Sequence, residues 1–179
     1  LYIKSGANPI FENVNIIGNT ANHIGGGGIF LNSGAILENI NVIGNTNYGI
    51  FINEGNSTIT QFNIINNGVG LFNNNNLNIP SATNNYWDHS SGPYHPSQNP
   101  SGQGDSTNQW VNVDPWLTTP NTDAPPIPAQ NTTVTGTGND FISLNWDASL
   151  IGDLAGYKLY YDSDSSGYPY ANSVDVGTD

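Results

Sequence analysis

The feature that most constrains this chain is an internal repeat. The phrase Leu37–Thr46 has a close copy before it at Phe11–Thr20 and a more divergent copy after it at Ile59–Gly68. A second, shorter phrase follows each copy, and its glycines recur with a strict period of 21 residues at Gly28, Gly49 and Gly70. Repeats with this period indicate a stack of structural units, each of which covers the apolar face of the next.

The apolar pattern within the repeat is that of β-strands. In Leu37–Thr46 the apolar Ile40 and Val42 flank a polar Asn41, and the run Gly49–Asn53 is rich in β-branched and aromatic residues. Such short runs, bounded by Gly and Asn, are typical of strands, and no segment carries the 3.6-residue stripe of an amphipathic helix. The sequence therefore predicts an all-β solenoid with several strands in each turn.

Parallel stacking of the turns would align equivalent residues in columns about 4.8 Å apart. Two columns of apolar residues are predicted to fill the interior: Val14, Ile40 and Phe62, then Ile16, Val42 and Ile64. Two polar columns are predicted at the corners: Asn13, Asn39 and Gln61, then Asn19, Asn45 and Asn67. Asn tolerates left-handed backbone geometry, and stacked amides can hydrogen-bond along a column. A disordered Asn-rich tract is the alternative, and the periodic apolar residues argue against it.

Charge and composition exclude several classes of partner. The chain has 2 basic and 14 acidic residues and a net charge of −12, which disfavours nucleic acid and anionic membranes. It contains no cysteine, so disulfides and thiolate metal sites are excluded. No apolar run reaches the roughly 18–20 residues of a membrane span. All the Asp residues lie from Asp88 onward and all the Glu residues before it, which predicts at least two structural units.

The sequence divides into four segments by these patterns. We expect stacked coils over 1–79, an aromatic cap over 80–120, a proline-rich linker over 121–128 and a second β module over 129–179. The cap is expected because an open stack exposes its core and its strand edges. Its aromatic residues are too many for a flexible linker: Tyr86, Trp87, Tyr94, Trp110 and Trp116.

The second module has two clearly alternating segments, Phe141–Asp147 and Gly156–Tyr161, after a short first strand at Thr132–Thr135. Alternation places Ile142, Leu144 and Trp146 on one face. Strands separated by about ten residues are typical of a β-sandwich.

These motifs resemble known families. The Asn-rich coils resemble the right-handed parallel β-helix repeats of the pectin-lyase-like superfamily, and the phrase N-Y-W-x-x-x-S-G-P-x-H-P, followed by G-x-G-D and P-W-L, resembles the segment that closes many bacterial β-helix proteins. The segment I-S-L-N-W-D…D-L-A-G-Y-K-L-Y-Y resembles the early strands of a fibronectin type III domain, in which the Trp and the first Tyr pack in the core. The resemblance implies an incomplete β-sandwich of low stability, and we expect the chain to be a piece of a longer protein.

One pair of carboxylates deserves comparison with a catalytic site. Glu12 and Glu38 occupy equivalent positions in the first two copies. Stacking would bring them close to the ~5 Å separation of retaining glycosidases. The third copy has Thr60 there, and no basic residue accompanies the pair in sequence. The alternative is a solvated pair that splays into water.

Three further groups of residues have both a functional and a structural interpretation. Asp88, His89, His95 and Asp105 could bind metal or move protons, or could bond turns of the cap. Tyr48, Tyr86, Trp110 and Tyr170 could stack on sugars if exposed, or could fill cores. Asp162, Asp164 and Ser166 fit the start of a calcium loop, or form a polar turn between strands.

The sequence thus predicts a non-catalytic scaffold with a glycan-binding or protein-binding role, from a secreted or cell-surface modular protein of a bacterium or archaeon. The expected partners are polysaccharides or surface glycans and other modules of the same chain, and no cofactor other than calcium. The alternative is the C-terminal end of a polysaccharide lyase or glycosidase whose active site lies upstream of residue 1. Fold alone does not decide between them, because such repeats serve many functions.

Overall fold

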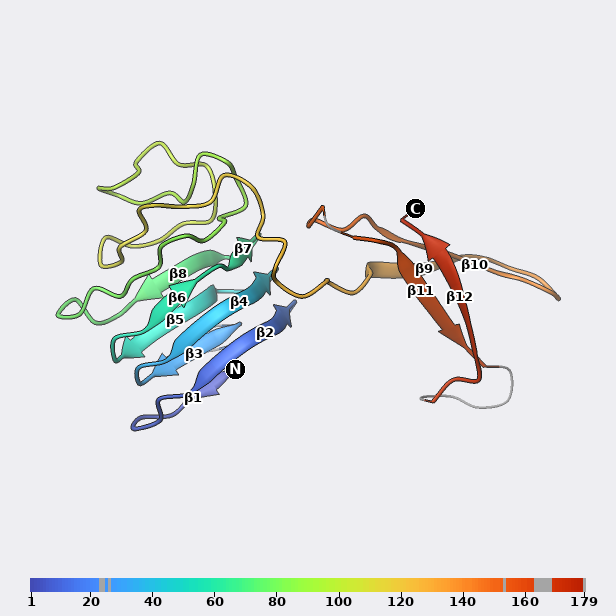
Figure 1. The fold of residues 1–179 in the computed structure, drawn as a ribbon, viewed down its shortest axis with the longest axis horizontal. Coiled ribbons are helices and arrows are strands. Elements are labelled where there is room, and N and C mark those ends of the chain that lie inside the picture. The colour runs from blue at the N-terminus through green and yellow to red at the C-terminus, as the bar shows by residue number, and fades with distance from the viewer. Residues whose placement is uncertain (23–24, 26, 153, 163–168, 179) are drawn as a thin grey trace. The chain divides into compact units, whose positions relative to one another are not determined.

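The computed structural model describes residues 1–22, 25, 27–152, 154–162 and 169–178 (Figure 1). These residues form twelve β-strands and no helix, which confirms the all-β class. The chain contacts divide it into two compact units, unit 1 (Leu1–Pro125) and unit 2 (Pro126–Asp179). Each unit is described on its own.

Unit 1 is built on two parallel sheets. The first sheet has the order β1–β3–β5–β8, with strands Tyr2–Ile3 (β1), Ile29–Asn32 (β3), Tyr48–Glu54 (β5) and Val69–Asn73 (β8). The second sheet consists of Ile10–Ile17 (β2), Ile36–Ile43 (β4), Thr58–Thr60 (β6) and Asn63–Ile65 (β7), where β6 and β7 both pair with β4. The chain alternates between the two sheets, so one strand region of each makes up one turn, here called a rung (Figure 1).

The register stacks each repeat copy directly on the next. Ile16 pairs with Val42, which pairs with Ile64. In the other sheet Ile29 pairs with Ile50 and Ile50 with Leu71. The parallel columns predicted from the repeat are therefore present, and the arrangement is compatible with a parallel β-helix.

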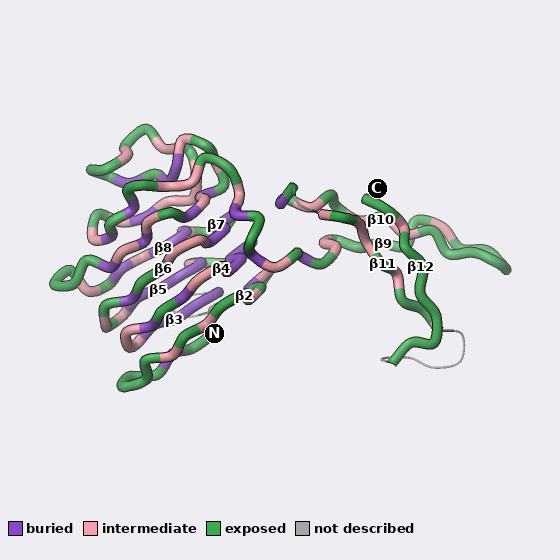
Figure 2. Tube along the Cα trace, in the orientation of Figure 1, coloured by how far each residue is buried: buried purple, intermediate pink, exposed green. Residues whose placement is uncertain are grey.

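The interior of unit 1 lies between the two sheets, and the buried residues in Figure 2 follow the strands while the turns are exposed. Five residues of the predicted apolar columns are buried and Val14 packs against them: Ile16, Ile40, Val42, Phe62 and Ile64. Residues of the first sheet complete this core: Ile29, Leu31, Ile50, Ile52 and Leu71, all fully buried.

One of the two predicted corner columns adopts the left-handed backbone that its sequence predicts. Asn13, Asn39 and Gln61 have φ of 58°, 52° and 59°, and Asn84 continues this column with φ of 56°. Asn adopts this conformation more readily than most residues because its short side chain bonds locally. The repeated Asn at this corner thus has a conformational cause.

The outer face of the first sheet carries a column of aromatic rings. Tyr2, Phe30, Phe51 and Phe72 stack with centroid separations of 5.3, 5.4 and 5.7 Å and interplanar angles of 12–26°. Because neighbouring rings face one another, they cover one another's faces and leave mainly their edges free. The column therefore acts as a packing feature rather than a platform for sugar rings.

The segment from Ser81 to Pro120 continues the stack, although its sequence repeat has ended. Ser81 pairs with Thr58 and Tyr86 with Asn63, while Asn112 pairs in turn with Ser81. These are isolated bridges without regular strands, as the prolines and glycines predict. Four of its residues belong to the core of unit 1: Ala82, Trp87, Val111 and Val113. The segment adds further rungs and covers the last one.

Unit 2 contains two antiparallel pairs. β9 (Gln130–Thr137) pairs with β10 (Ile142–Asp147), and β11 (Tyr157–Tyr161) pairs with β12 (Asn172–Gly177). The first three strands lie where the sequence predicts them, and β12 is an additional strand. Alternation along β10 leaves Leu144 and Trp146 half-buried between exposed neighbours.

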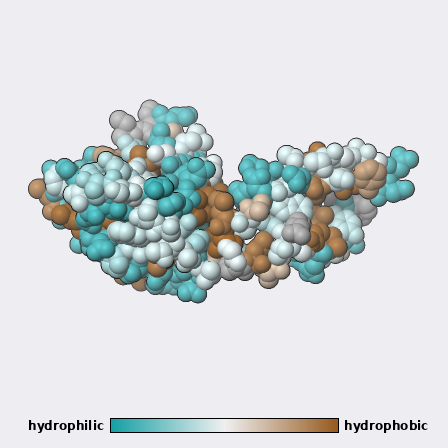
Figure 3. All heavy atoms as spheres, turned by 90° about the horizontal axis from the view of Figure 1, so that it is seen from above, coloured by the Kyte–Doolittle hydropathy of each residue, from teal (hydrophilic) through white to brown (hydrophobic). Residues whose placement is uncertain are grey.

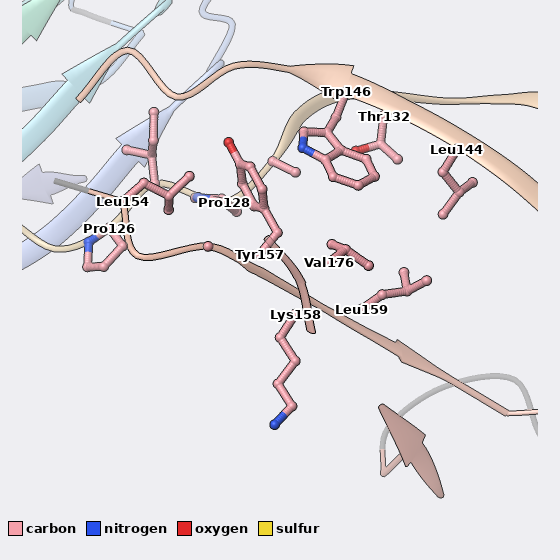
Figure 4. Close-up of a pocket in the computed structure, with 13 residues that line it drawn as sticks. Pro126, Pro128, Thr132, Leu144, Trp146, Leu154, Tyr157, Lys158, Leu159 and Val176 are labelled. Atoms are coloured by element: carbon pink, nitrogen blue, oxygen red, sulfur yellow. The ribbon is translucent and has the colours of Figure 1, made fainter. Parts of the chain in front are cut away.

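A cavity of about 420 Å³ lies within unit 2 between the two strand pairs. Figure 4 shows Trp146, Tyr157, Leu159 and Val176 directed toward this space, while the Lys158 side chain extends away from it. Trp146 and Tyr157 meet edge to face at 5.3 Å. Large hydrophobic residues remain exposed on all four described strands of this unit, and the space-filling view shows apolar patches on it (Figure 3). They include Val134, Ile142 and Val174.

Candidate functional site

The most elaborate polar structure in unit 1 is a ladder of side-chain amides. Asn19 Nδ2 donates to Asn45 Oδ1 at 2.9 Å, and Asn45 Nδ2 donates to Asn67 Oδ1 at 3.0 Å. Asn67 Nδ2 then donates to Asp105 Oδ2 at 2.8 Å. The ladder therefore crosses three rungs and ends on a carboxylate in the segment from Ser81 to Pro120, here called the covering segment. We call it the buried ladder, since Asn45 is 1% exposed.

Each amide of the ladder also holds the backbone. The oxygen of Asn45 accepts the Asn19 backbone N–H at 3.0 Å, and its nitrogen donates to the Ile16 carbonyl at 3.0 Å. Asn67 does the same one rung later, with the Asn45 N–H at 3.0 Å and the Val42 carbonyl at 2.8 Å. Each side chain accepts hydrogen bonds at Oδ1 and donates them from Nδ2. Asp could only accept when ionised, which explains why Asn and not Asp recurs at this corner.

The glycines with the 21-residue period make room for this ladder. A Cβ on Gly49 would lie 2.9 Å from Asn67 Cγ and 2.8 Å from the Gly70 carbonyl oxygen. A Cβ on Gly70 would lie 2.8 Å from Asp105 Cβ. Each glycine thus leaves space for the ladder side chain of the following rung. The period of the glycines and the recurrence of the ladder asparagines therefore have the same structural cause.

Asp105 lies in a partly desolvated position at the end of the ladder. Its Oδ2 also accepts the Asn67 backbone N–H at 3.0 Å, and its own N–H donates to the Trp87 carbonyl at 2.9 Å. Burial raises the pKa of Asp105 to about 6, with a smaller raising effect from Asp88, while hydrogen bonds from Asn67 oppose the shift. Desolvation penalises the charged form more than these donors favour it.

Asp88 and Tyr86 are the neighbouring titratable groups. Burial raises the pKa of Asp88, while a backbone hydrogen bond from Asn66 and the charge of His89 lower it. Burial raises the pKa of Tyr86, and the Asp88 carboxylate adds to that effect. The covering segment thus brings two carboxyl groups, Asp88 and Asp105, close enough to influence one another.

A second ladder runs along the outer face of the second sheet. Asn41 Nδ2 donates to Asn15 Oδ1 at 2.7 Å, and Asn63 Nδ2 donates to Asn41 Oδ1 at 2.8 Å. The chain itself covers this face after the last rung: Asn121 N–H donates to Asn63 Oδ1 at 2.7 Å, and Asn41 Nδ2 donates to the Pro125 carbonyl at 2.7 Å. The segment Asn121–Pro125, here called the strap, therefore belongs to unit 1.

The predicted carboxylate pair is stacked, and one of its members is exposed. Glu12 and Glu38 are direct Cα partners between β2 and β4, and Thr60 follows in β6. Glu12 is exposed and Glu38 is half-buried. The geometry brings the two backbone positions together as the repeat predicts.

The two histidines of the covering segment form hydrogen bonds with the backbone of its turns. His95 is fully buried, its Nδ1 accepts the backbone N–H groups of Ser97 and Gln98 at 3.2 and 2.9 Å, and its Nε2 lies 3.0 Å from the Val111 carbonyl. His89 Nδ1 accepts the Ser91 N–H at 3.1 Å. These contacts fit the structural interpretation of both residues.

The aromatic candidates for ligand binding are only partly accessible. Tyr86 and Trp110 are half-buried, and the Trp110 carbonyl accepts Asn73 Nδ2 at 2.7 Å. Tyr48 packs against Phe51 and Phe72, while Tyr170 is 41% exposed. Among the described residues, no ring of these four candidates stacks on another of them.

The predicted calcium loop falls largely outside the described part of the chain, since Asp164 and Ser166 lie within the segment 163–168. Asp162 is described, and its Oδ2 accepts the Ala171 N–H at 3.3 Å. Elsewhere in the described ranges, no cluster of three or more His, Cys, Asp or Glu side chains could hold a metal ion.

The residue that sequence reasoning placed least well is Asp105. The phrase G-x-G-D, which ends in Asp105, is the sequence signal for this contact, because a Cβ on Gly104 would meet the Trp87 carbonyl oxygen and a Cβ on Gly102 would meet the Pro93 carbonyl oxygen. These glycines let the covering segment approach the stack closely enough for Asp105 to reach Asn67.

Comparisons with protein-family models, curated proteins and solved structures gave no match. No helix in the described residues has the length and apolar character that a membrane crossing requires.

Proposed function

We propose that unit 1 is the final part of a right-handed parallel β-helix and that its role is structural. It would serve as a rigid spacer or scaffold in a secreted or cell-surface protein of a bacterium or archaeon. The observation that carries this proposal is the buried ladder from Asn19 to Asp105. Its polar side chains bond neighbouring rungs and are directed into the fold rather than toward a substrate cleft.

Unit 2 would be the first part of a fibronectin type III-like sandwich. The edge-to-face contact of Trp146 and Tyr157 supports this assignment, because those two residues carry the sequence resemblance. The cavity beside them would be the part of the sandwich core that these four strands leave unfilled.

The partners of such a scaffold would be polysaccharides, surface glycans or other modules of the same protein. The net charge of −12 supports neutral or cationic partners over nucleic acid. Half-buried Tyr86 and Trp110 would contribute to a glycan contact.

Hydrogen exchange tests the structural role. In a rigid scaffold the backbone amides of Asn45 and Asn67, which donate to ladder oxygens, should exchange only through global unfolding. Exchange of these amides by local opening, far faster than global unfolding allows, would contradict the proposal.

The second candidate is an enzyme of the polysaccharide lyase or glycosidase class. The stacking of Glu12 on Glu38 is the observation that favours it. Incubation of the chain with neutral and acidic polysaccharides, with and without calcium, should give no new reducing ends or unsaturated products if the scaffold proposal is correct. Turnover that Glu12→Gln or Glu38→Gln abolishes would establish the enzyme instead.

A further inference from the structure

We propose that the dipeptide Asn67–Gly68 is a deamidation site that the buried ladder protects in the folded chain, and that its reaction makes unfolding of unit 1 irreversible. Asn is followed directly by Gly at this one place in the sequence. Gly has no Cβ to hinder attack by its backbone nitrogen on the preceding side chain, so Asn67 is the most reactive Asn in the unfolded chain. The inference goes beyond a passive scaffold, because it assigns a covalent change to one ladder residue.

The reaction needs no partner other than water. The Gly68 backbone nitrogen loses its proton to solvent base and forms a bond to the side-chain carbonyl carbon of Asn67, Cγ. The bond between Cγ and Nδ2 then breaks, and ammonia leaves with a proton from water, so a five-membered cyclic imide remains. Water opens this imide at one of its two carbonyl carbons and gives either aspartate or isoaspartate.

The fold requires the reactive dipeptide at this corner. The first two ladder residues are followed by Thr20 and Thr46, whereas the third is followed by Gly68. A Cβ on Gly68 would lie 2.6 Å from the Asn47 carbonyl oxygen and 3.0 Å from the Asn47 nitrogen. A less reactive residue therefore cannot replace Gly68 unless the neighbouring backbone shifts.

The ladder immobilises both groups that must react. Asn67 Oδ1 accepts the Asn45 backbone N–H and Asn45 Nδ2, each at 3.0 Å, while Asn67 Nδ2 donates to the Val42 carbonyl and to Asp105 Oδ2, each at 2.8 Å. The attacking nitrogen is also engaged, because the Gly68 N–H donates to the Asn45 carbonyl at 3.2 Å. Attack requires Cγ and this nitrogen to approach to bonding distance. These hydrogen bonds must break first, so the reaction proceeds from opened or unfolded chains.

Either product damages the ladder at its covered end. The aspartate product is ionised at neutral pH and has no hydrogen to donate. Its carboxylate would face the Val42 carbonyl and the Asp105 carboxylate, the two groups that Asn67 Nδ2 contacts in the folded chain. Two carboxylates at this distance repel one another, and isoaspartate also lengthens the backbone by one atom. A chain that stays unfolded long enough to react therefore cannot close its last rung again.

Peptide mapping by mass spectrometry tests the protection. The full chain is incubated at mildly alkaline pH, once folded and once unfolded in urea, and Asn67 is followed by the mass gained when an amide becomes an acid. In the unfolded chain Asn67 should react before every other Asn. In the folded chain its deamidation should be at least about tenfold slower, and a smaller difference would overturn the proposal.

Two variants test whether the ladder is the cause of the protection. Asp105→Ala removes the acceptor of both the Asn67 backbone N–H and Asn67 Nδ2, so it should speed deamidation of the folded chain. Asn53→Ala, which removes an amide from the surface column, is the matched control and should speed it less. Equal rates in the two variants would contradict protection by the ladder. If Asp105→Ala does not fold, the comparison of folded and unfolded wild-type chain still decides.

Refolding tests the irreversibility. After increasing times in urea, the fraction of the wild-type chain that refolds should fall in parallel with the fraction of intact Asn67. Asn67→Asp, which carries one of the two products, should unfold at a lower urea concentration than the wild-type chain at neutral pH. Recovery of the native unfolding midpoint by the deamidated chain, or an Asn67→Asp variant as stable as the wild-type chain, would overturn the irreversible step.

Discussion

Replacement of Asn45 by alanine tests whether the buried ladder stabilises the stack. The side chain makes four hydrogen bonds: two accepted from Asn19, at 3.0 and 2.9 Å, and two donated, to Ile16 and Asn67, both at 3.0 Å. A hydrogen bond contributes a net ~1 kcal/mol, and a buried group left without its partner costs somewhat more. Because Asn19 is exposed and can turn to water, we expect Asn45→Ala to lower the free energy of unfolding by about 3 kcal/mol.

The chain offers a matched control on its surface. Asn53 also stands in an amide column, donating to Asn32 at 2.8 Å and accepting from Asn74 at 3.1 Å, but it is only half-buried. Water can replace both bonds there, so Asn53→Ala should cost less than about 1 kcal/mol. Urea unfolding followed by far-ultraviolet circular dichroism measures both values.

A third variant tests the direction of the bonds. Asn45→Asp keeps the shape of the side chain, but its carboxylate would face the Ile16 carbonyl and Asn67 Oδ1 without a hydrogen to donate. At pH 7 it should therefore destabilise unit 1 at least as much as alanine does. Equal losses for Asn45→Ala and Asn53→Ala, or a smaller loss for Asn45→Asp than for Asn45→Ala, would refute the reasoning.

Three other perturbations have defined outcomes. Gly49→Ala places a Cβ 2.8 Å from a backbone oxygen of the next rung and should cost more than about 2 kcal/mol in urea unfolding, whereas Gly152→Ala, with no atom within 4 Å of the new Cβ, should cost less than about 0.5. Asn121→Ala removes the bonds that the side-chain amide of the strap donates to Asn39 and Gln61, and should speed limited proteolysis within 121–128, while an unchanged rate would show that the strap is held by other contacts. Trp146→Ala removes the edge-to-face contact with Tyr157 and should lower the melting temperature of unit 2 alone, and a shift of both calorimetric transitions would contradict the division into independent units.

Much of unit 1 follows from its repeat. The columns through Ile40 and Val42 are interior because strand residues alternate in direction, and the alignment of equivalent residues between the copies predicts their register. The left-handed Asn39 and the stacked Asn45 were predictable for the same reason, since both residues recur at fixed positions.

The covering segment was less predictable because no periodicity connects it to the rungs. Trp87 is interior and Asp105 ends the ladder. Loops of irregular length separate these residues along the chain, so no fixed spacing in the sequence indicates their positions. Contacts of this kind depend on how the loops close, which local sequence does not encode. The strap is a similar case: the prolines of 121–128 suggest a linker, but Asn121 is held by the amide of Asn63, a residue distant in sequence.

The pairing of each periodic glycine with the amide of the following rung has a consequence for how such a chain can change length. A duplication or deletion of one whole turn leaves every glycine opposite an amide, so the fold can accommodate the change and the stack grows or shrinks by one rung. An insertion of any other length within the strands would set a bulky residue against the ladder at Gly28, Gly49 or Gly70. Genetic variation in this protein should therefore occur in steps of one turn, with loops outside the ladder as the exception.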